Sequence, residues 1–259
     1  GSVREALGHA FFTLSLGMGA MITYGSYIAR NQSIVKASGV IVLLDTVIAL
    51  VATVIMFTVI FTAGMQDQVG DTGTVGMLFI SLPQLFFAEG IVPGGSFLAP
   101  LFYVLVALAA LTSTMSLLEV VTSYIIDEHE IERGKATLAC GTVVFLFTIL
   151  AALSFGGADF ASNLSAPGRI GNLLFAGKTS WFGMADHFVS NWMLPTGGLA
   201  ITVAAGWFMT RESTESELVD ETVPGWFNYN TWRFFIRYIS PAAVAAIVVA
   251  VLFFGVDFS

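Results

Sequence analysis

The sequence predicts an all-α integral membrane protein with six transmembrane helices, the first of them discontinuous. Of its 259 residues, 56% are hydrophobic and only 11% are charged, and the mean hydropathy is +0.83. So few charged residues cannot cover a soluble domain of this length, so lipid is the expected surrounding. Apolar runs long enough to cross a bilayer as a helix, about 20 residues, also recur along the chain.

Six apolar segments have the length of a membrane span, and the connections between them are polar or rich in Gly. The predicted spans cover residues 6–28, 34–63, 97–126, 136–155, 181–209 and 232–254. A shorter apolar run, residues 75–88, contains Pro83 and is flanked by acidic residues and glycines. This run predicts a re-entrant or interfacial helix in an outer loop rather than a span.

Lys and Arg residues in the short loops predict the orientation, because they concentrate on the cytoplasmic side. If the first span runs inward, seven basic residues lie inside and three outside, and both chain ends lie outside. The inner set is Arg30, Lys36, Arg133, Lys135, Arg211, Arg233 and Arg237, and the outer set is Arg4, Arg169 and Lys178. This topology, with a first residue other than Met, suggests that residues 1–259 form a single membrane domain that is a piece of a longer chain.

The charge and the potential metal ligands argue against two classes of partner. The net charge of −8 argues against nucleic acid. His9, His129 and His187 lack metal-ligand spacing, so we assign no transition-metal site. Cys140, the only cysteine, lies in an apolar run and is interpreted as a buried, inert thiol.

The first span contains the sequence Ser-Leu-Gly-Met-Gly-Ala at residues 15–20. Glycines weaken a helix by about 1 kcal/mol each relative to Ala. Two interpretations remain open from the spacing. In the first, the small residues allow close helix packing. In the second, the helix is broken in mid-membrane, where its carbonyls face a cation and its free N–H groups face a carboxylate.

Polar residues within the other spans each allow two interpretations. Asp45 lies at membrane depth, where a carboxylate costs roughly 2.5–3.5 kcal/mol, and is either a cation or proton site or a structural contact. The hydroxyls near Thr112 offer hard oxygen ligands suited to Na⁺, or bond back to the preceding turn. Glu119 is either a pathway acid or a satisfied polar contact, and Asp186 with His187 is either a solvated helix start or an outer gate.

Several of these stretches resemble the neurotransmitter:sodium symporter family, in particular its prokaryotic members. Residues 10–20 with 23–27 (AFFTLSLGMGA, TYGSY) resemble the sixth helix of that family, and residues 109–113 (AALTS) resemble its eighth helix. Residues 82–86 resemble its outer loop and residues 237–241 (RYISP) the start of its eleventh helix. The resemblance covers essentially the whole chain as helices six to eleven, and implies an inverted-repeat transporter fold whose first five helices are absent.

The resemblance implies roles for individual residues. Where the family usually has Asn at the first ion, this chain has Asp45, which could supply the negative charge that chloride supplies in animal relatives, or titrate. The implied Na⁺ ligands are Thr13, Asp45, Ala109, Thr112 and Ser113. The implied substrate pocket is lined by Phe12, Ser15, Met18, Ser113 and Leu117. Asp186 is the implied outer gate, and Tyr27 with Asp127 belongs to the inner gate.

The function that the resemblance implies is sodium-coupled symport of an amino acid or related small amine by alternating access. We expect two Na⁺ sites, no chloride requirement and no enzymatic activity, in a multi-pass protein of the inner or plasma membrane. The expected partners are the small substrate, the bilayer and helices one to five; the oligomeric state stays open, a homo-oligomer included. The alternatives are a non-transporting scaffold or receptor and an inactive fragment. An intramembrane enzyme is disfavoured, because its paired Asp, Ser–His couple or HExxH helix is not found.

Overall fold

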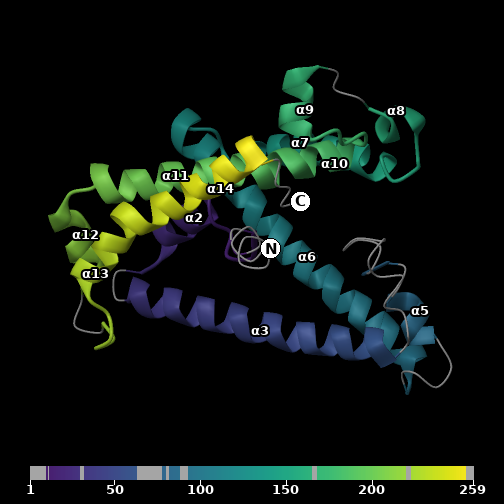
Figure 1. The fold of residues 1–259 in the computed structure, drawn as a ribbon, viewed down its shortest axis with the longest axis horizontal. Helices are drawn as coiled ribbons and strands as arrows, with labels where there is room; N and C mark the ends of the chain where they lie inside the picture. The colour runs from purple at the N-terminus through teal and green to yellow at the C-terminus, as the bar shows by residue number, and fades with distance from the viewer. Residues whose placement is uncertain are drawn as a thin grey trace. The chain divides into compact units, whose positions relative to one another are not determined.

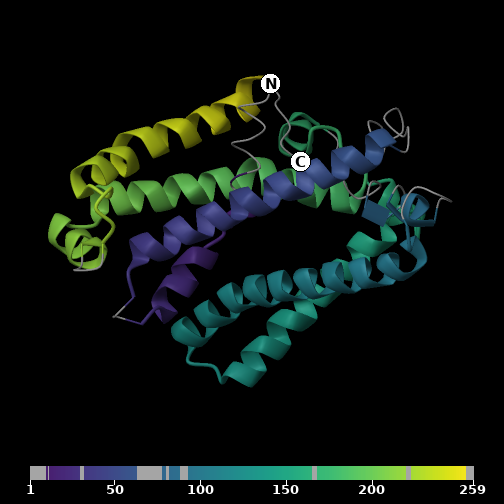
Figure 2. The same ribbon diagram turned by 90° about the horizontal axis from the view of Figure 1, so that it is seen from below.

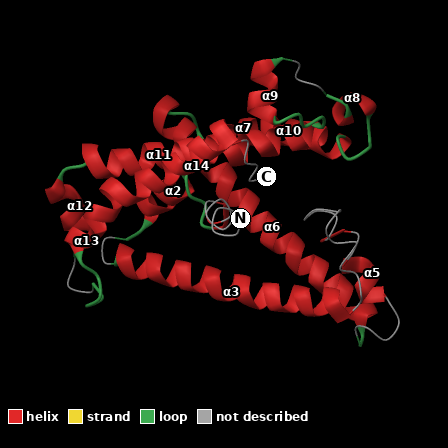
Figure 3. Ribbon diagram, in the orientation of Figure 1, coloured by secondary structure: helices red, strands yellow, loops and turns green. Residues whose placement is uncertain are grey.

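The computed structural model describes residues 10, 12–29, 32–62, 78–79, 82–87, 93–164, 168–219 and 223–254. These residues form helices joined by turns and loops, and no β-strand occurs among them (Figure 3). Within them, five helical segments are long and apolar enough to cross a membrane. They run from Ile34 to Thr58, Gly95 to His129, Arg133 to Leu153, Trp181 to Phe208, and Tyr229 to Val251. The prediction of an all-helical membrane protein is therefore confirmed.

The bounds of the helices stay close to the predicted spans (Figure 1). Helices α3 (Ile34–Thr62), α6 (Gly95–His129) and α7 (Arg133–Leu153) are continuous. The next span combines α10 (Trp181–Phe188), the π-helix η2 (Val189–Met193), α11 (Leu194–Val203) and the π-helix η3 (Ala204–Phe208). The last combines α13 (Tyr229–Phe234), the π-helix η4 (Phe235–Ile239) and α14 (Ser240–Phe254). Shorter helices are α8 (Asp159–Ser162), α9 (Arg169–Phe175) and α12 (Arg211–Leu218).

The first predicted span is interrupted. Its described helix, α2 (Ala20–Tyr27), begins only after an irregular stretch of turn and bend at residues 14–19. Residues 12–13 on the other side of this stretch are again helical. The part of the predicted span before residue 10 lies outside the described residues. The discontinuous first helix is thus observed where the Gly-rich sequence predicted it.

The chain divides into two units, one of residues 1–40 with 117–259 and one of residues 41–116. In the first unit, α11 and α14 lie side by side in both views (Figures 1 and 2). Their shared core contains Val244 and Ile247 of α14 against Leu199 of α11. The end of α7 meets the start of α10, where the rings of Phe155 and Phe182 have centroids 5.0 Å apart. Helix α11 forms the surface on which the interrupted segment packs.

The second unit holds part of the predicted outer loop. Within the predicted helix at residues 75–88, the structure describes a six-residue helix, α5 (Leu82–Phe87), and residues 78–79. The hydroxyl of Tyr103 on α6 donates to the carbonyl of Leu78 at 2.7 Å, and the rings of Phe86 and Phe102 have centroids 5.6 Å apart. The outer loop is thereby anchored to the N-terminal half of α6. The remaining residues of that predicted helix lie outside the described part.

Candidate functional site

The interrupted segment owes its shape to three residues with positive φ. Ser15 has φ 52°, Gly17 has φ 81° and Gly19 has φ 82°. Glycine adopts such angles without steric cost, whereas a residue with a Cβ is strained there. The φ of Ser15 is thus a strained feature of a kind that gathers at functional sites. We call residues 14–19 the break.

Helical hydrogen bonding stops within the break. The amide of Leu14 donates to the carbonyl of Ala10 at 3.1 Å, and the amide of Ser15 donates to the carbonyl of Phe12 at 3.2 Å. Regular bonding resumes where the amides of Ile22 and Thr23 both donate to the carbonyl of Gly19 at 3.0 Å. In the part of the chain that the structure describes, the amides of residues 16–19 donate no main-chain hydrogen bond. They are available to a ligand, as the discontinuous-helix interpretation requires.

The break rests on the first turn of α11. A Cβ placed on Gly17 would lie 2.3 Å from the carbonyl oxygen of Leu194, and one placed on Gly197 would lie 2.3 Å from the carbonyl oxygen of Gly17. Leu194, Pro195 and Gly198 on this turn are buried. Two main chains therefore meet directly, with no side chain between them. The close packing of the glycines and the interruption of the helix are both observed, and the binding of a cation and a carboxylate there stays a prediction.

A cavity of about 380 Å³ borders the break in the first unit. Its lining residues include Ser15 and Gly17 of the break, Thr202 of α11, and Ser240 and Val244 of α14. Of the predicted substrate residues in this unit, Ser15 lines it, whereas Phe12, Met18 and Leu117 do not. This cavity is therefore not the predicted substrate pocket.

A three-residue polar contact joins α2, α6 and α7. The hydroxyl of Tyr27 donates to Oε1 of Glu119 at 2.8 Å. Nη2 of Arg133 lies 2.9 Å from Oε1 and 2.7 Å from Oε2 of the same carboxylate. The side chain of Glu119 is 20% exposed and that of Arg133 is 67% exposed. Of the two interpretations of Glu119, the satisfied polar contact is the one observed.

The predicted inner gate contains Tyr27 and Asp127, and the hydroxyl of Tyr27 donates to Glu119. Asp127 lies exposed near the end of α6, two turns beyond Glu119. Tyr27 thus lies where α2 meets α6, and the gate roles of Tyr27 and Asp127 stay predictions.

The predicted Na⁺ ligands on α6 lie in the second unit. The hydroxyl of Thr112 donates to the carbonyl of Ala109 at 2.8 Å, so the back-bonding interpretation holds and two expected ligands are adjacent. Ser113 is exposed on the same turn, and Asp45 is half-buried on α3. Thr13 belongs to the first unit and ends the helical turn before the break. The predicted Na⁺ ligands are thus divided between the two units, with Thr13 in the first and the others in the second.

The C-terminal end of α10 and the adjoining η2 hold a buried polar pair that the sequence did not signal. His187 is 2% exposed and Asn191 is 1% exposed. Nδ2 of Asn191 lies 3.1 Å from Nδ1 of His187 and donates to the carbonyl of His187 at 3.2 Å. The solvated-start interpretation is therefore wrong for His187. Neighbouring Asp186 is half-buried and accepts from the hydroxyl of Ser190 at 3.5 Å.

Comparison with known proteins identifies the family. The model of the sodium:neurotransmitter symporter family matches residues 2–167. The chain belongs to this family. It is 32% identical over 243 residues to the uncharacterized sodium-dependent transporter YhdH of Bacillus subtilis (strain 168), covering 94% of this chain and 49% of that protein. An uncharacterized sodium-dependent transporter of Haemophilus influenzae is 28% identical over 253 residues, covering 95% of this chain and 49% of that protein.

The fold is also that of a solved family transporter. The crystal structure of MhsT in complex with L-phenylalanine matches with a TM-score of 0.77 and 30% identity, covering 95% of this chain and 51% of that chain. This symporter-family chain thus spans about half the length of the bacterial relatives and of the solved structure it matches. It is a multi-pass membrane protein, and its family consists of transporters, not enzymes.

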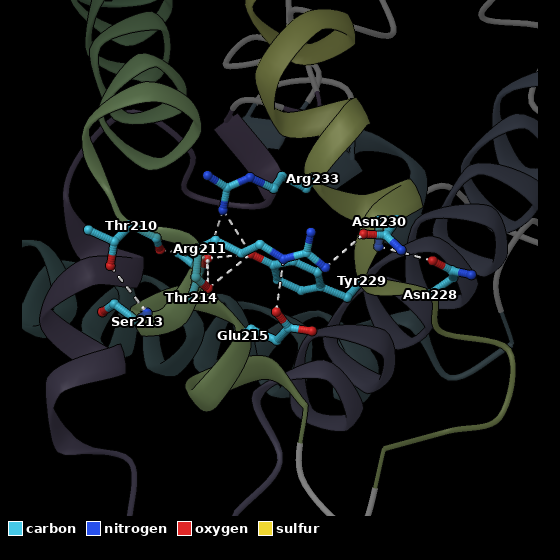
Figure 4. A network of polar contacts seen from close by, with 9 residues as sticks. All are labelled: Thr210, Arg211, Ser213, Thr214, Glu215, Asn228, Tyr229, Asn230 and Arg233. Carbon is cyan, nitrogen blue, oxygen red and sulfur yellow. Dashed lines mark hydrogen bonds and ion pairs between the residues drawn. The ribbon is translucent and has the colours of Figure 1, made fainter.

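A second polar cluster, which the sequence did not signal, lies between α12 and the start of α13 in this family member (Figure 4). The Tyr229 hydroxyl lies 2.6 Å from Oγ1 of Thr214 and accepts from Nη1 of Arg233 at 2.8 Å. Nε of Arg211 donates to Oε2 of Glu215 at 3.0 Å. This carboxylate raises the pKa of Arg211 through the hydrogen bond and its charge, so Arg211 stays cationic. The cluster fixes α12 against α13.

Proposed function

We propose that the natural full-length protein is a sodium-coupled symporter that carries an amino acid, or a related small amine, by alternating access. The observation that carries the proposal is the break in the first span. Its main-chain carbonyls can replace the hydration shell of an alkali cation, and its unbonded amides can receive a carboxylate. An amino acid zwitterion together with Na⁺ presents the groups that such a segment can bind.

The first proposed ion is held by Thr13, through its side chain and carbonyl, and by Asp45. A carboxylate at the ion neutralises the cation inside the membrane, where an uncompensated charge is costly. Chloride is therefore not required in this proposal. Asp45 supplies the negative charge itself.

The second proposed ion is held by the carbonyl of Ala109 and the hydroxyls of Thr112 and Ser113. These are hard oxygen ligands, which suit Na⁺ better than a soft metal. The hydroxyl of Thr112 lies 2.8 Å from the carbonyl oxygen of Ala109, which supports their binding one ion after a small rotation of the hydroxyl. An inward step of one charge through about 100 mV contributes about 2.3 kcal/mol, so two ions concentrate the substrate strongly.

The proposed substrate pocket is lined by Phe12, Ser15, Met18, Ser113 and Leu117. Met18 is unbranched and polarizable, which suits apolar side chains of differing shape. The likeness to MhsT in complex with L-phenylalanine supports an amino acid substrate.

The proposed gates lie at the two ends of the pathway. Asp186 acts at the outer end, and Tyr27 with Asp127 acts at the inner end. The hydrogen bond of Tyr27 to Glu119 supports the gate assignment, because it joins the C-terminal end of α2 to α6, and the Lys and Arg distribution predicts that this end faces the cytoplasm. We infer residence in the inner or plasma membrane, where a sodium gradient exists.

The proposal is tested by uptake of labelled apolar and aromatic amino acids into proteoliposomes that contain the full-length protein. We expect uptake with an inward Na⁺ gradient and none when K⁺ replaces Na⁺. Thr112→Ala should raise the Na⁺ concentration for half-maximal uptake. Thr114→Ala is the matched control, since its hydroxyl also only bonds back to its own helix, at 2.9 Å from the carbonyl of Leu111. Amino acid binding without any uptake would favour the scaffold or receptor function, and equal Na⁺ dependence in both variants would refute the second ion site.

A further inference from the structure

The first turn of α11 presents bare main chain to the break. A Cβ on Gly197 would lie 2.3 Å from the carbonyl oxygen of Gly17 and 3.2 Å from its carbonyl carbon. We propose that Gly197 is a positioning residue for the ion and substrate site: its missing side chain lets the Gly17 carbonyl rest on α11 and so sets the path of residues 13–18. This inference rests on the proposed function, because those residues include the proposed ligands Thr13, Ser15 and Met18.

The contact cannot accommodate a side chain by a small adjustment. A Cβ essentially never lies within 3.0 Å of a non-bonded heavy atom outside its own residue and the two chain neighbours, so a Cβ at residue 197 forces a shift of at least about 0.7 Å. The atoms that must move are main-chain atoms of Gly17, not the end of a flexible side chain. On the other side, the turn is held by buried Leu194 and Pro195. The break is therefore the part that moves.

Space for that movement is present in the same unit. The cavity of about 380 Å³ borders Gly17, Gly19 and Gly198. Because the break borders open space here rather than packed side chains, a shift of the break does not require the core of α11 and α14 to unpack. We therefore expect a Gly197 variant to fold, with its ion and substrate ligands misplaced.

The first experiment measures sodium-coupled uptake by the full-length protein in proteoliposomes for Gly197→Ala and Gly197→Ser. Both variants add the same Cβ but differ in polarity and in helix propensity, so an equal effect of the two points to the steric contact. Gly141→Ala is the control, because a Cβ on Gly141 in α7 meets no atom within 4 Å in the described structure. We expect both variants to raise the Na⁺ concentration for half-maximal uptake and the substrate KM on the order of tenfold, at unchanged protein amount.

The outcome separates positioning from packing. If both variants keep the KM and the sodium dependence of the unsubstituted protein and only the amount of folded protein falls, Gly197 serves packing alone and the inference is wrong. If the unsubstituted protein takes up amino acids without sodium, the proposed function itself fails, and this is seen before any variant is compared.

A second measurement needs no variant and covers the case that neither one folds. Amide hydrogen exchange of the unsubstituted full-length protein is followed by mass spectrometry with Na⁺ and with K⁺. We expect Na⁺ to slow exchange in peptides from residues 12–20 and also in peptides from residues 194–200, with no change near residue 141. Protection of residues 12–20 without any change at residues 194–200 would overturn the inference.

Discussion

Replacing Glu119 by Gln tests whether the contact of Tyr27, Glu119 and Arg133 stabilises one conformation of the protein. The substitution keeps the shape and one hydrogen-bond acceptor for the Tyr27 hydroxyl, but it removes the charge that Arg133 binds at 2.7 Å and 2.9 Å. The contact joins three helices. Its loss should therefore shift the conformational equilibrium away from the conformations in which the contact forms.

The magnitude follows from the exposure of the two side chains. A hydrogen bond to a charged group contributes about 1.5–3 kcal/mol when buried, and an exposed ion pair contributes about 0–1 kcal/mol. Glu119 is 20% exposed and Arg133 is 67% exposed, which places this contact between the two cases. We expect a loss of about 1–2 kcal/mol, which corresponds to a shift of roughly five- to thirtyfold in the conformational equilibrium.

The assay compares Glu119→Gln with Glu132→Gln in the full-length protein. Glu132 also forms an ion pair, 3.1 Å from Nζ of Lys135, but both side chains are largely exposed, at 72% and 78%. Sodium-dependent uptake and the accessibility of a cysteine introduced at exposed Tyr24 are measured for both. Glu119→Gln should alter the rate of uptake and the accessibility, and Glu132→Gln should alter neither. Equal behaviour of the two variants would refute the argument that this contact controls a conformational step.

Three further predictions concern other contacts. Gly17→Ala should abolish sodium-dependent uptake, whereas Gly19→Ala should only reduce it. Both glycines have positive φ, but a Cβ at residue 17 would lie 2.3 Å from a main-chain oxygen, and a Cβ at residue 19 would meet only the Val120 side chain, at 3.3 Å. Equal losses of uptake in the two variants would contradict this steric reasoning. Asp45→Asn should make uptake dependent on chloride, measured with gluconate as the replacement anion, and chloride-independent uptake by this variant would remove the proposed charge role. Tyr229→Phe should destabilise the protein by about 1–3 kcal/mol, because Arg233 and Thr214 lose a buried hydrogen-bond partner. Thermal unfolding compares this variant with Tyr124→Phe, in which the substituted side chain is exposed. Equal melting temperatures of the two variants would contradict the prediction.

Local features of this chain could be predicted from sequence because their causes are local. Apolar length alone predicts the long helices, since a span needs about 20 apolar residues whatever surrounds it. Gly17 and Gly19 predict the break because glycine alone adopts their φ without cost. The outer-loop helix was foreseen as residues 75–88, of which the structure describes a helix over Leu82–Phe87. The π-helices within the last two spans carry no comparable signal.

Contacts between distant residues could not be predicted in the same way. Tyr27 and Glu119 are 92 positions apart, and their hydrogen bond depends on how α2 packs on α6. A lone acid in an apolar helix is equally compatible with a pathway role and with a satisfied contact, so the sequence left both open. The burial of His187 and Asn191 likewise depends on the helices packed around α10. Residues four positions apart contact each other in any helix, and the sequence does not show which of these pairs is buried by neighbouring helices.

The unpaired main-chain groups of the break connect its packing on α11 with the proposed coupling between ion binding and substrate binding. Unpaired main-chain groups are costly in an apolar surrounding, on the order of several kcal/mol each, and the amides of residues 16–19 have no main-chain partner in the described structure. The contact with Gly197 positions one carbonyl but satisfies none of these amides. A cation at the carbonyls and a carboxylate at the amides each relieve part of this cost and order the same few residues. Whichever binds first therefore lowers the cost of ordering for the other, and by linkage the effect is reciprocal. In this proposal coupling between ion and substrate is a property of one short segment, and it weakens whenever α11 no longer holds that segment in place.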